Sequence, residues 1–221
     1  MQEAFQMMLE LPPDDPDVLA GNIMFGPNRW PDAAPTFRAV MESYFDTMME
    51  LTRVLLSAFA RGLGLADDFF QSDFRKPLTQ LRLLHYPPQP PDSDSEGVEA
   101  HTDTGAFTIL MQDDVGGLEV RTRAGLWIPA TPIPGAFVIN IGDMMQRWTN
   151  GRFVSTPHRV RNRTGRDRVS VPFFANPDYG AMITPLIGAG GDDETSYAPL
   201  ACGPYVEAAY RAAWPRAERK E

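Results

Sequence analysis

Residues 105–121 read GAFTILMQDDVGGLEVR, which is two β-like segments joined at the glycine pair Gly116-Gly117. The first segment is rich in aromatic and β-branched residues, which favour strands. Consecutive glycines supply the positive φ angles that a tight hairpin turn needs. This stretch therefore predicts an antiparallel hairpin, with strands over 105–112 and 117–121.

Further β-like segments lie on both sides of this hairpin and are separated by short turns rather than by long helices. Asn150-Gly151 is expected to form a tight hairpin turn, and the stretch Pro132-Ile133-Pro134-Gly135 is a typical turn sequence before another strand. Short strands in close succession argue against a βαβ repeat and favour an antiparallel barrel or double sheet. We expect a mainly β fold with flanking helices and a double-stranded β-helix (jelly-roll) core over residues 78–187. The other expected strands cover 78–86, 126–130, 136–141, 153–161 and 168–175.

The remaining segments are expected to cover this core within one domain, residues 1–221. Apolar residues recur at three- and four-residue steps over 36–64, which predicts a long helix buried against a sheet, with Thr36 as its cap. Asp68-Phe69-Phe70 suggests a short helix, and an apolar stripe predicts a last helix over 203–214. Prolines and aspartates crowd residues 1–35, so an irregular covering segment is expected there.

Composition limits the classes of function. The chain has 221 residues, a formal net charge of −9 and a single cysteine, Cys202, so it can form neither an internal disulfide nor a thiolate metal cluster. The acidic balance opposes binding to nucleic acid or to an anionic membrane surface. With no long apolar run and no signal sequence at its start, the chain is expected to be cytoplasmic and to act on a small molecule.

The triplet His101-Thr102-Asp103 and the distant His158 carry the main chemical signal. Strand-like alternation would put His101 and Asp103 on one side, and a barrel can bring His158 beside them. Two imidazoles and one carboxylate suit Fe(II) and leave coordination positions open for oxygen and a chelating cosubstrate. A structural zinc site would instead favour four closed ligands. His85, the third histidine of the chain, is expected to play a structural hydrogen-bonding role.

Arg168 follows His158 by ten residues, and Ser170 should share its strand face. A guanidinium and a hydroxyl pointing into a barrel could bind a carboxylate with strong directional contacts, which suits a dicarboxylate cosubstrate. The alternative is a salt bridge between Arg168 and a structural acid. Arginines crowd the surrounding stretch, and all of them except Arg168 are expected to form a solvated edge, although the cluster could also steer an anionic substrate. They are Arg147, Arg152, Arg159, Arg161, Arg163, Arg166 and Arg168.

Six motifs occur along the chain in a characteristic order. They are Leu81–Pro91, His101–Asp103, Gly116–Val120, Ile139–Asp143, Asn150–Phe153 with Ser155–Val160, and Arg168–Phe174. Together they resemble the 2-oxoglutarate and Fe(II)-dependent dioxygenases, specifically the isopenicillin N synthase-like branch. The resemblance runs from about residue 78 to 175 and is weaker outside.

The resemblance implies roles for the motif residues. His101, Asp103 and His158 would bind the iron, Arg168 and Ser170 would bind the distal carboxylate of 2-oxoglutarate, and Tyr86 would donate a further hydrogen bond to it. The cofactors would be Fe(II), 2-oxoglutarate and O2. The reaction would release succinate and CO2 while a small-molecule substrate is oxidised, usually by hydroxylation.

Two departures from the family pattern accompany the resemblance. Leu84 stands where relatives commonly carry a polar residue, and the chain begins almost at the proline-rich segment, as if the N-terminal family region were truncated. Loss of that region would expose a sheet edge and favour a homo-oligomer or a partner chain.

Core or surface roles are favoured over substrate contact for Phe107, Phe174 and Arg159. Two alternatives stay open: an oxidase of the isopenicillin N synthase type that does not use 2-oxoglutarate, and a truncated noncatalytic binding module.

Overall fold

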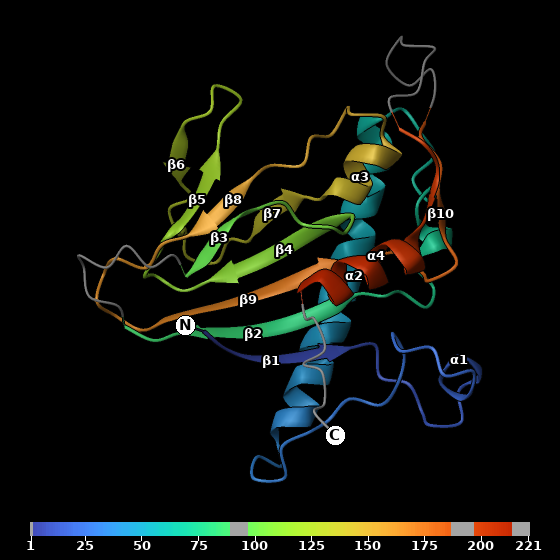
Figure 1. Cartoon of the computed structure of the whole chain (residues 1–221), viewed down its shortest axis with the longest axis horizontal. Coiled ribbons are helices and arrows are strands. Elements are labelled where there is room, and N and C mark those ends of the chain that lie inside the picture. The colour runs from blue at the N-terminus through green and yellow to red at the C-terminus, as the bar shows by residue number, and fades with distance from the viewer. Residues whose placement is uncertain (1, 89–96, 187–196, 214–221) are drawn as a thin grey trace.

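The computed structural model describes residues 2–88, 97–186 and 197–213, and its strands form two main antiparallel sheets (Figure 1). The larger sheet has the order β1 (Glu3–Met8), β2 (Gln80–Tyr86), β9 (Arg168–Ala175), β4 (Phe107–Gln112) and β7 (Val138–Ile141). The smaller sheet has the order β3 (Val98–His101), β8 (His158–Val160), β5 (Leu118–Arg121) and β6 (Trp127–Pro129). A separate pair contains β10 (Met182–Ile183) and β11 (Leu200–Ala201). This arrangement confirms the predicted double-stranded β-helix fold class.

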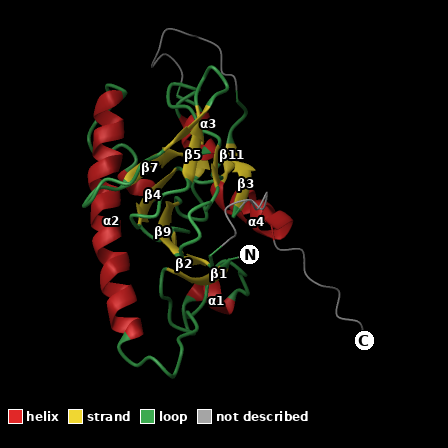
Figure 2. Cartoon of the chain, turned by 90° about the vertical axis from the view of Figure 1, so that its left-hand side faces the viewer, coloured by secondary structure: helices red, strands yellow, loops and turns green. Residues whose placement is uncertain are grey.

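The long helix α2 (Phe37–Gly62) covers one face of the larger sheet (Figure 2). Its buried face packs aromatic side chains edge-on against the strands: the ring centroid of Phe45 lies 5.3 Å from that of Phe173, and the centroid of Phe59 lies 5.2 Å from that of Phe107. The predicted helix against a sheet is therefore correct. Thr36 occupies the N-cap position but forms no cap hydrogen bond through its side chain, because its backbone is already helical.

The N-terminal segment is more regular than its prolines indicate. Residues 3–8 form β1, which pairs antiparallel with β2 from Glu3↔His85 to Met8↔Gln80. A one-turn helix, α1 (Pro16–Leu19), begins with Pro16 in its first turn, where the missing amide is tolerated, and Asp15 caps it by accepting the amide of Asp17 at 2.9 Å. The prediction of an entirely irregular cover over 1–35 is therefore wrong for these two elements.

Three shorter helices complete the described structure. The turn near Phe70 is a 3-10 helix, η1 (Gln71–Asp73), slightly later than expected. Helix α4 (Cys202–Ala213) confirms the expected last helix within one residue of its predicted start. Helix α3 (Asp143–Trp148) was not predicted, because six residues are too few to display a helical period. Asn150-Gly151 closes the turn after α3, with the amide of Gly151 donating to Gln146 at 2.8 Å, and so does not form the predicted hairpin.

The expected strand over 153–161 is confined to β8, whereas the strand expected over 168–175 has those bounds in β9. Gly116 and Gly117 adopt φ angles of 78° and 88°, as a tight turn requires. The predicted hairpin is nevertheless wrong, because β4 pairs with β7 and β9 in the larger sheet, whereas β5 pairs with β6 and β8 in the smaller one. The predicted ends at residues 187 and 214, and the last residues of the 81–91 motif, lie outside the described residues. Among the described helices, none has both the length and the apolar character needed to cross a bilayer.

Candidate metal centre and adjoining cavity

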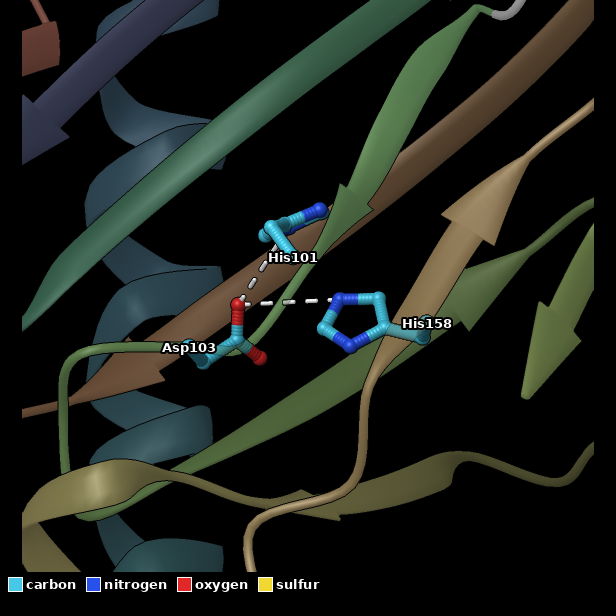
Figure 3. Close-up of side chains that lie close together, drawn as sticks. All are labelled: His101, Asp103 and His158. Atoms are coloured by element: carbon cyan, nitrogen blue, oxygen red, sulfur yellow. Dashed lines mark ion pairs between the residues drawn. The ribbon is translucent and has the colours of Figure 1, made fainter. Parts of the chain in front are cut away.

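Three side chains from two distant parts of the chain, His101 with Asp103 and the later His158, converge at one end of the smaller sheet (Figure 3). His101 ends β3 and His158 begins β8, and the two residues are register partners across that antiparallel pair. Asp103 lies in the loop after β3, so strand alternation, the expected reason for its position beside His101, does not apply. The predicted convergence of the three side chains is nevertheless present.

One carboxylate oxygen faces both imidazoles. Oδ1 of Asp103 lies 3.8 Å from Nε2 of His101 and 3.7 Å from Nε2 of His158, and the candidate ligand atoms all lie within 4.8 Å of one another. A first-row metal binds nitrogen and oxygen at about 2.0–2.2 Å, so two atoms on one ion stand at most about 4.4 Å apart. Both carboxylate–imidazole distances fall inside this limit, and the donor set suits Fe(II) with open positions.

Backbone carbonyls set the tautomer of each imidazole. Nδ1 of His101 donates to the carbonyl of Glu99 at 2.8 Å, and Nδ1 of His158 donates to the carbonyl of Thr156 at 3.1 Å. Since a carbonyl only accepts, Nδ1 carries the proton and the lone pair of Nε2 faces Asp103. Burial lowers the pKa of His158, with the charge of Asp103 opposing this effect, so the neutral, ligand-competent form is favoured.

The second carboxylate oxygen of Asp103 is held by neighbours that the sequence did not single out. Oδ2 accepts the hydroxyl of Thr108 at 2.6 Å and the side-chain amide of Asn140 at 2.8 Å. Thr108 and Asn140 are register partners on β4 and β7. Asn140 belongs to the Ile139–Asp143 motif, which is the only sequence signal that could have pointed to it.

A cavity of about 430 Å³ adjoins the three side chains and is lined by residues of both main sheets. Its walls are largely aliphatic, which is typical of small-molecule sites that use a few placed polar groups. The aliphatic lining includes Leu84, Val98, Leu110, Leu118, Val120, Val138 and Val160. Leu84, the apolar departure noted from the sequence, is therefore part of the cavity wall.

The predicted carboxylate-binding residues line the same cavity. Arg168 is 1% exposed, donates Nε to the carbonyl of Gly116 at 2.6 Å and donates Nη1 to Oγ of Ser170 at 3.2 Å. Its guanidinium carbon lies 4.9 Å from the ring centroid of Tyr86. Burial lowers the pKa of Arg168. Among the described residues, no carboxylate forms an ion pair with Arg168, so the structural salt bridge considered above does not form there.

The other residues considered from the sequence lie elsewhere or have different surroundings. His85 hydrogen-bonds Glu3 and Asp167 at 2.9 and 2.8 Å, which agrees with its expected structural role. Phe107 is buried in the core and Arg159 pairs with Glu119 at 2.6 Å, whereas Phe174 lines the cavity. Of the clustered arginines, Arg168 alone is among the described residues that line the cavity.

Comparisons with known proteins point to the same family that the sequence motifs resemble. The profile of the 2OG-Fe(II) oxygenase superfamily matches residues 78–177. A 2-oxoglutarate-Fe(II) type oxidoreductase of Emericella nidulans is 36% identical over 99% of this chain and 65% of its own length. A 2-oxoglutarate-dependent dioxygenase of Monascus ruber is 38% identical over 88% of this chain and 63% of its own length. The chain thus spans less than two thirds of these two curated relatives.

Solved structures agree in fold as well as in sequence. A 2OG-Fe(II) oxygenase family protein from Caulobacter crescentus superimposes with a TM-score of 0.85 and 34% identity, covering 97% of this chain and 70% of that one. A full-length Neurospora crassa protein in complex with alpha-KG and thymine has a TM-score of 0.85 and 30% identity, covering 96% of this chain and 65% of that one. By sequence profile, sequence identity and fold, the chain belongs to the 2OG-Fe(II) oxygenase superfamily.

Proposed function

We propose that this protein is an Fe(II)- and 2-oxoglutarate-dependent dioxygenase that oxidises a small molecule, most simply by hydroxylation, with release of succinate and CO2. The observation that carries the proposal is the pairing of two features in one cavity. His101, Asp103 and His158 converge at one part of its wall, and the buried guanidinium of Arg168 lines another. A metal-binding site and a carboxylate-binding site are the two requirements for chelating a 2-oxo acid.

Each side chain has a defined task in this proposal. His101, Asp103 and His158 hold Fe(II), which supplies the redox chemistry with dioxygen when bound. Arg168 and Ser170 bind the distal carboxylate of 2-oxoglutarate, and Tyr86 flanks the guanidinium. The aliphatic wall excludes water, which strengthens the contact between the guanidinium and a carboxylate.

Small-molecule substrates are supported by the size of the cavity and by the solved relatives, which include the Neurospora crassa protein in complex with thymine and JOX2 in complex with JA. Membership of the isopenicillin N synthase-like branch, the single-domain organisation and the cytoplasmic location stay predictions. So does an assembly with a second copy or a partner chain.

Succinate formation tests the proposal. The iron-loaded protein should form succinate from 2-oxoglutarate only when oxygen is present, and His101→Ala should abolish metal uptake and succinate formation together. An intact, iron-loaded protein that never consumes 2-oxoglutarate with a broad substrate panel contradicts the proposal. Calorimetry without oxygen then separates the alternatives, since an oxidase of the isopenicillin N synthase type takes up no 2-oxoglutarate. If His101→Ala changes neither metal uptake nor activity, the three side chains are not a catalytic metal site.

A further inference from the structure

The connection between β4 and β5, which we call the 113–117 turn, crosses from the larger sheet to the smaller one (Figure 1). Asp113 at its start hydrogen-bonds the backbone of β9. Gly116 and Gly117 at its end contact the side chain of Arg168 and the backbone that follows β8. The turn therefore touches both the strand that carries the expected carboxylate-binding residues and the strand that carries a metal ligand.

The carbonyl of Gly116 fixes the guanidinium of Arg168. It accepts Nε at 2.6 Å, and Arg168 is 1% exposed, so this hydrogen bond is shielded from water. A guanidinium is planar and rigid, so holding Nε also fixes the direction of the terminal nitrogens, Nη1 and Nη2. With Nε occupied, a carboxylate can contact two nitrogens of Arg168 at once only through Nη1 and Nη2. The turn thus determines which edge of the guanidinium a ligand meets.

The backbone that presents this carbonyl requires glycine. Gly116 and Gly117 both have positive φ angles, which residues with a side chain adopt only at a cost. A Cβ at Gly117 would also lie 2.7 Å from the carbonyl oxygen of Arg161. The amide of Arg161 donates to the carbonyl of Gly117 at 2.8 Å. This close approach joins the turn to the backbone directly after β8.

The same backbone carries the metal ligand His158, three residues before Arg161 or about 10 Å along an extended strand. His158 and Arg168 belong to different sheets, so the distance between them depends on how the sheets are joined. The turn joins them through two hydrogen bonds, one to the backbone after β8 and one to the guanidinium. It is therefore placed to set the distance between the metal centre and the carboxylate-binding nitrogens.

Asp113 attaches the start of the turn to β9. Its amide donates to the carbonyl of Val169 at 3.2 Å, and its Oδ2 accepts the amide of Val169. Its Oδ1 accepts the amide of Val115 at 3.0 Å, which tightens the turn. Burial lowers the pKa of Arg168, whereas the negative charge of Asp113 opposes this effect. Asp113 therefore supports Arg168 both through the neighbouring backbone and through its charge.

We propose that the 113–117 turn is a positioning element for the cosubstrate. By holding Nε of Arg168 against the backbone beside β8, it keeps the terminal nitrogens at a set distance from the metal ligands, and so selects a 2-oxo diacid of one chain length. The proposal rests on the proposed dioxygenase function, and it adds Asp113 and Gly116 as residues that act on the cosubstrate through Arg168. 2-Oxoglutarate is the diacid that should fit, and a diacid with one more methylene group should fit less well.

Three 2-oxo acids test the selection by chain length. They are 2-oxoglutarate, the longer diacid 2-oxoadipate, and 2-oxopentanoate, which lacks the distal carboxylate. Each is titrated by calorimetry without oxygen into the Fe(II)-loaded protein. The wild type should bind 2-oxoglutarate about tenfold or more tightly than either of the others, because only 2-oxoglutarate places a carboxylate at the correct distance for charge-assisted hydrogen bonds.

Asp113→Ala should weaken binding of 2-oxoglutarate by about tenfold, since it removes the side-chain hydrogen bonds that hold the turn. It should weaken 2-oxoadipate less, and it should leave 2-oxopentanoate unchanged because that acid does not reach Arg168. Asp113→Asn keeps one acceptor oxygen and should restore part of the affinity. Asp114→Ala is the matched control, because the carboxylate of Asp114 is exposed and pairs with Arg166 at 3.1 Å.

A pair of glycine variants tests the carbonyl itself. Gly116→Ala and Gly135→Ala introduce a side chain at φ angles of 78° and 75°. An added Cβ would lie 3.6 Å from Pro132 at Gly116 and more than 4 Å from any neighbour at Gly135, so both variants carry mainly backbone strain. Gly116→Ala should weaken 2-oxoglutarate binding, whereas Gly135→Ala should not.

Hydrogen exchange of the Nε proton of Arg168 tests the positioning in the protein without metal or cosubstrate. NMR should show slow exchange in the wild type, because the proton is buried and hydrogen-bonded, and faster exchange in Asp113→Ala and Gly116→Ala. The signal is identified by its absence in Arg168→Lys. Rapid exchange in the wild type would overturn the proposal without any turn variant, even if those variants do not fold.

The binding data have equally clear contrary outcomes. Wild-type affinity and chain-length preference in folded Asp113→Ala or Gly116→Ala would overturn the proposal, as would an equal loss in Asp114→Ala or Gly135→Ala. Equal weakening of all three 2-oxo acids would show a general structural role for the turn and would also overturn it. A wild type with slow exchange at Arg168 that binds no 2-oxoglutarate would instead contradict the proposed function.

Discussion

The side-chain amide of Asn140 donates to Oδ2 of Asp103 at 2.8 Å and leaves Oδ1 facing the two imidazoles. Thr108 reinforces this orientation through its hydroxyl, which donates to the same Oδ2 at 2.6 Å. Partners of this kind hold a ligand in place without contacting the metal, and their loss typically weakens metal binding by about 10- to 100-fold.

Asn140→Leu should therefore raise the dissociation constant for Fe(II) by roughly 10- to 100-fold, and Thr108→Val should act in the same direction. An anaerobic Fe(II) titration measures both. Thr47→Val is the control, because Thr47 is exposed on α2 and its hydroxyl donates only to the carbonyl of Ser43. Unchanged Fe(II) affinity in both site variants would show that Asp103 needs no such support.

Arg168→Leu should weaken 2-oxoglutarate binding by roughly a hundredfold, because charge-assisted hydrogen bonds to a carboxylate contribute about 1.5–3 kcal/mol each. Arg166→Leu is a close control, since Arg166 is exposed and pairs with Asp114 at 3.1 Å. Anaerobic calorimetry gives both dissociation constants. Equal affinity in the two variants would mean that the cosubstrate carboxylate binds elsewhere.

Gly142→Ala should disturb the metal centre through the backbone. A Cβ at Gly142 would lie 2.2 Å from the carbonyl oxygen of Gly105 and 3.0 Å from that of Asp103, so the ligand-bearing loop must move. We expect a loss of about 1–3 kcal/mol in unfolding free energy together with weaker Fe(II) binding. Gly26→Ala is the control, since no atom lies within 4 Å of its added Cβ. Urea unfolding and Fe(II) titration measure the two quantities. Equal unfolding free energies and equal Fe(II) affinities in the two variants would contradict the prediction.

His85 should make stability depend on pH. The hydrogen bond to Glu3, and to a lesser extent the one to Asp167, raises the pKa of His85 above the ordinary 6.5. The imidazole therefore binds a proton more tightly in the folded protein than in the unfolded chain. The stabilisation is full below pH 6.5 and is lost as pH rises through the raised pKa. The effect is small and weakens with salt because these side chains are exposed. Urea unfolding between about pH 5.5 and 8.5 should show a decline in the wild type that His85→Gln reduces. Identical pH profiles of unfolding free energy in the wild type and in His85→Gln would show that His85 does not make stability depend on pH.

Local patterns were sufficient to predict much of the fold. The apolar period of α2 and the strand-forming segment of β9 are local properties, and each is buried as its pattern predicts. Helix α3 has no room to display a period, and β1 is a strand because it pairs with β2, which its own residues do not reveal.

The candidate site likewise contains residues that the sequence predicted and residues that it did not. Ligand chemistry identified His101, Asp103 and His158 because few residue types bind iron, and the structure brings them together, although their binding role stays a prediction. Asn140 and Thr108 meet Asp103 only through the register of β4 and β7, and Gly116 meets Arg168 only because the 113–117 turn lies beside β9. Such tertiary relationships leave no local signal in a single sequence.

The most direct test of the central claim is an anaerobic absorption spectrum of the protein with Fe(II) and 2-oxoglutarate. If three side chains hold the iron and Arg168 holds the cosubstrate, a weak visible charge-transfer band should develop on adding 2-oxoglutarate to the Fe(II) protein. The band should be absent in His101→Ala and should need far more 2-oxoglutarate in Arg168→Leu. A folded wild-type protein that binds Fe(II) but develops no such band at saturating 2-oxoglutarate would contradict the account.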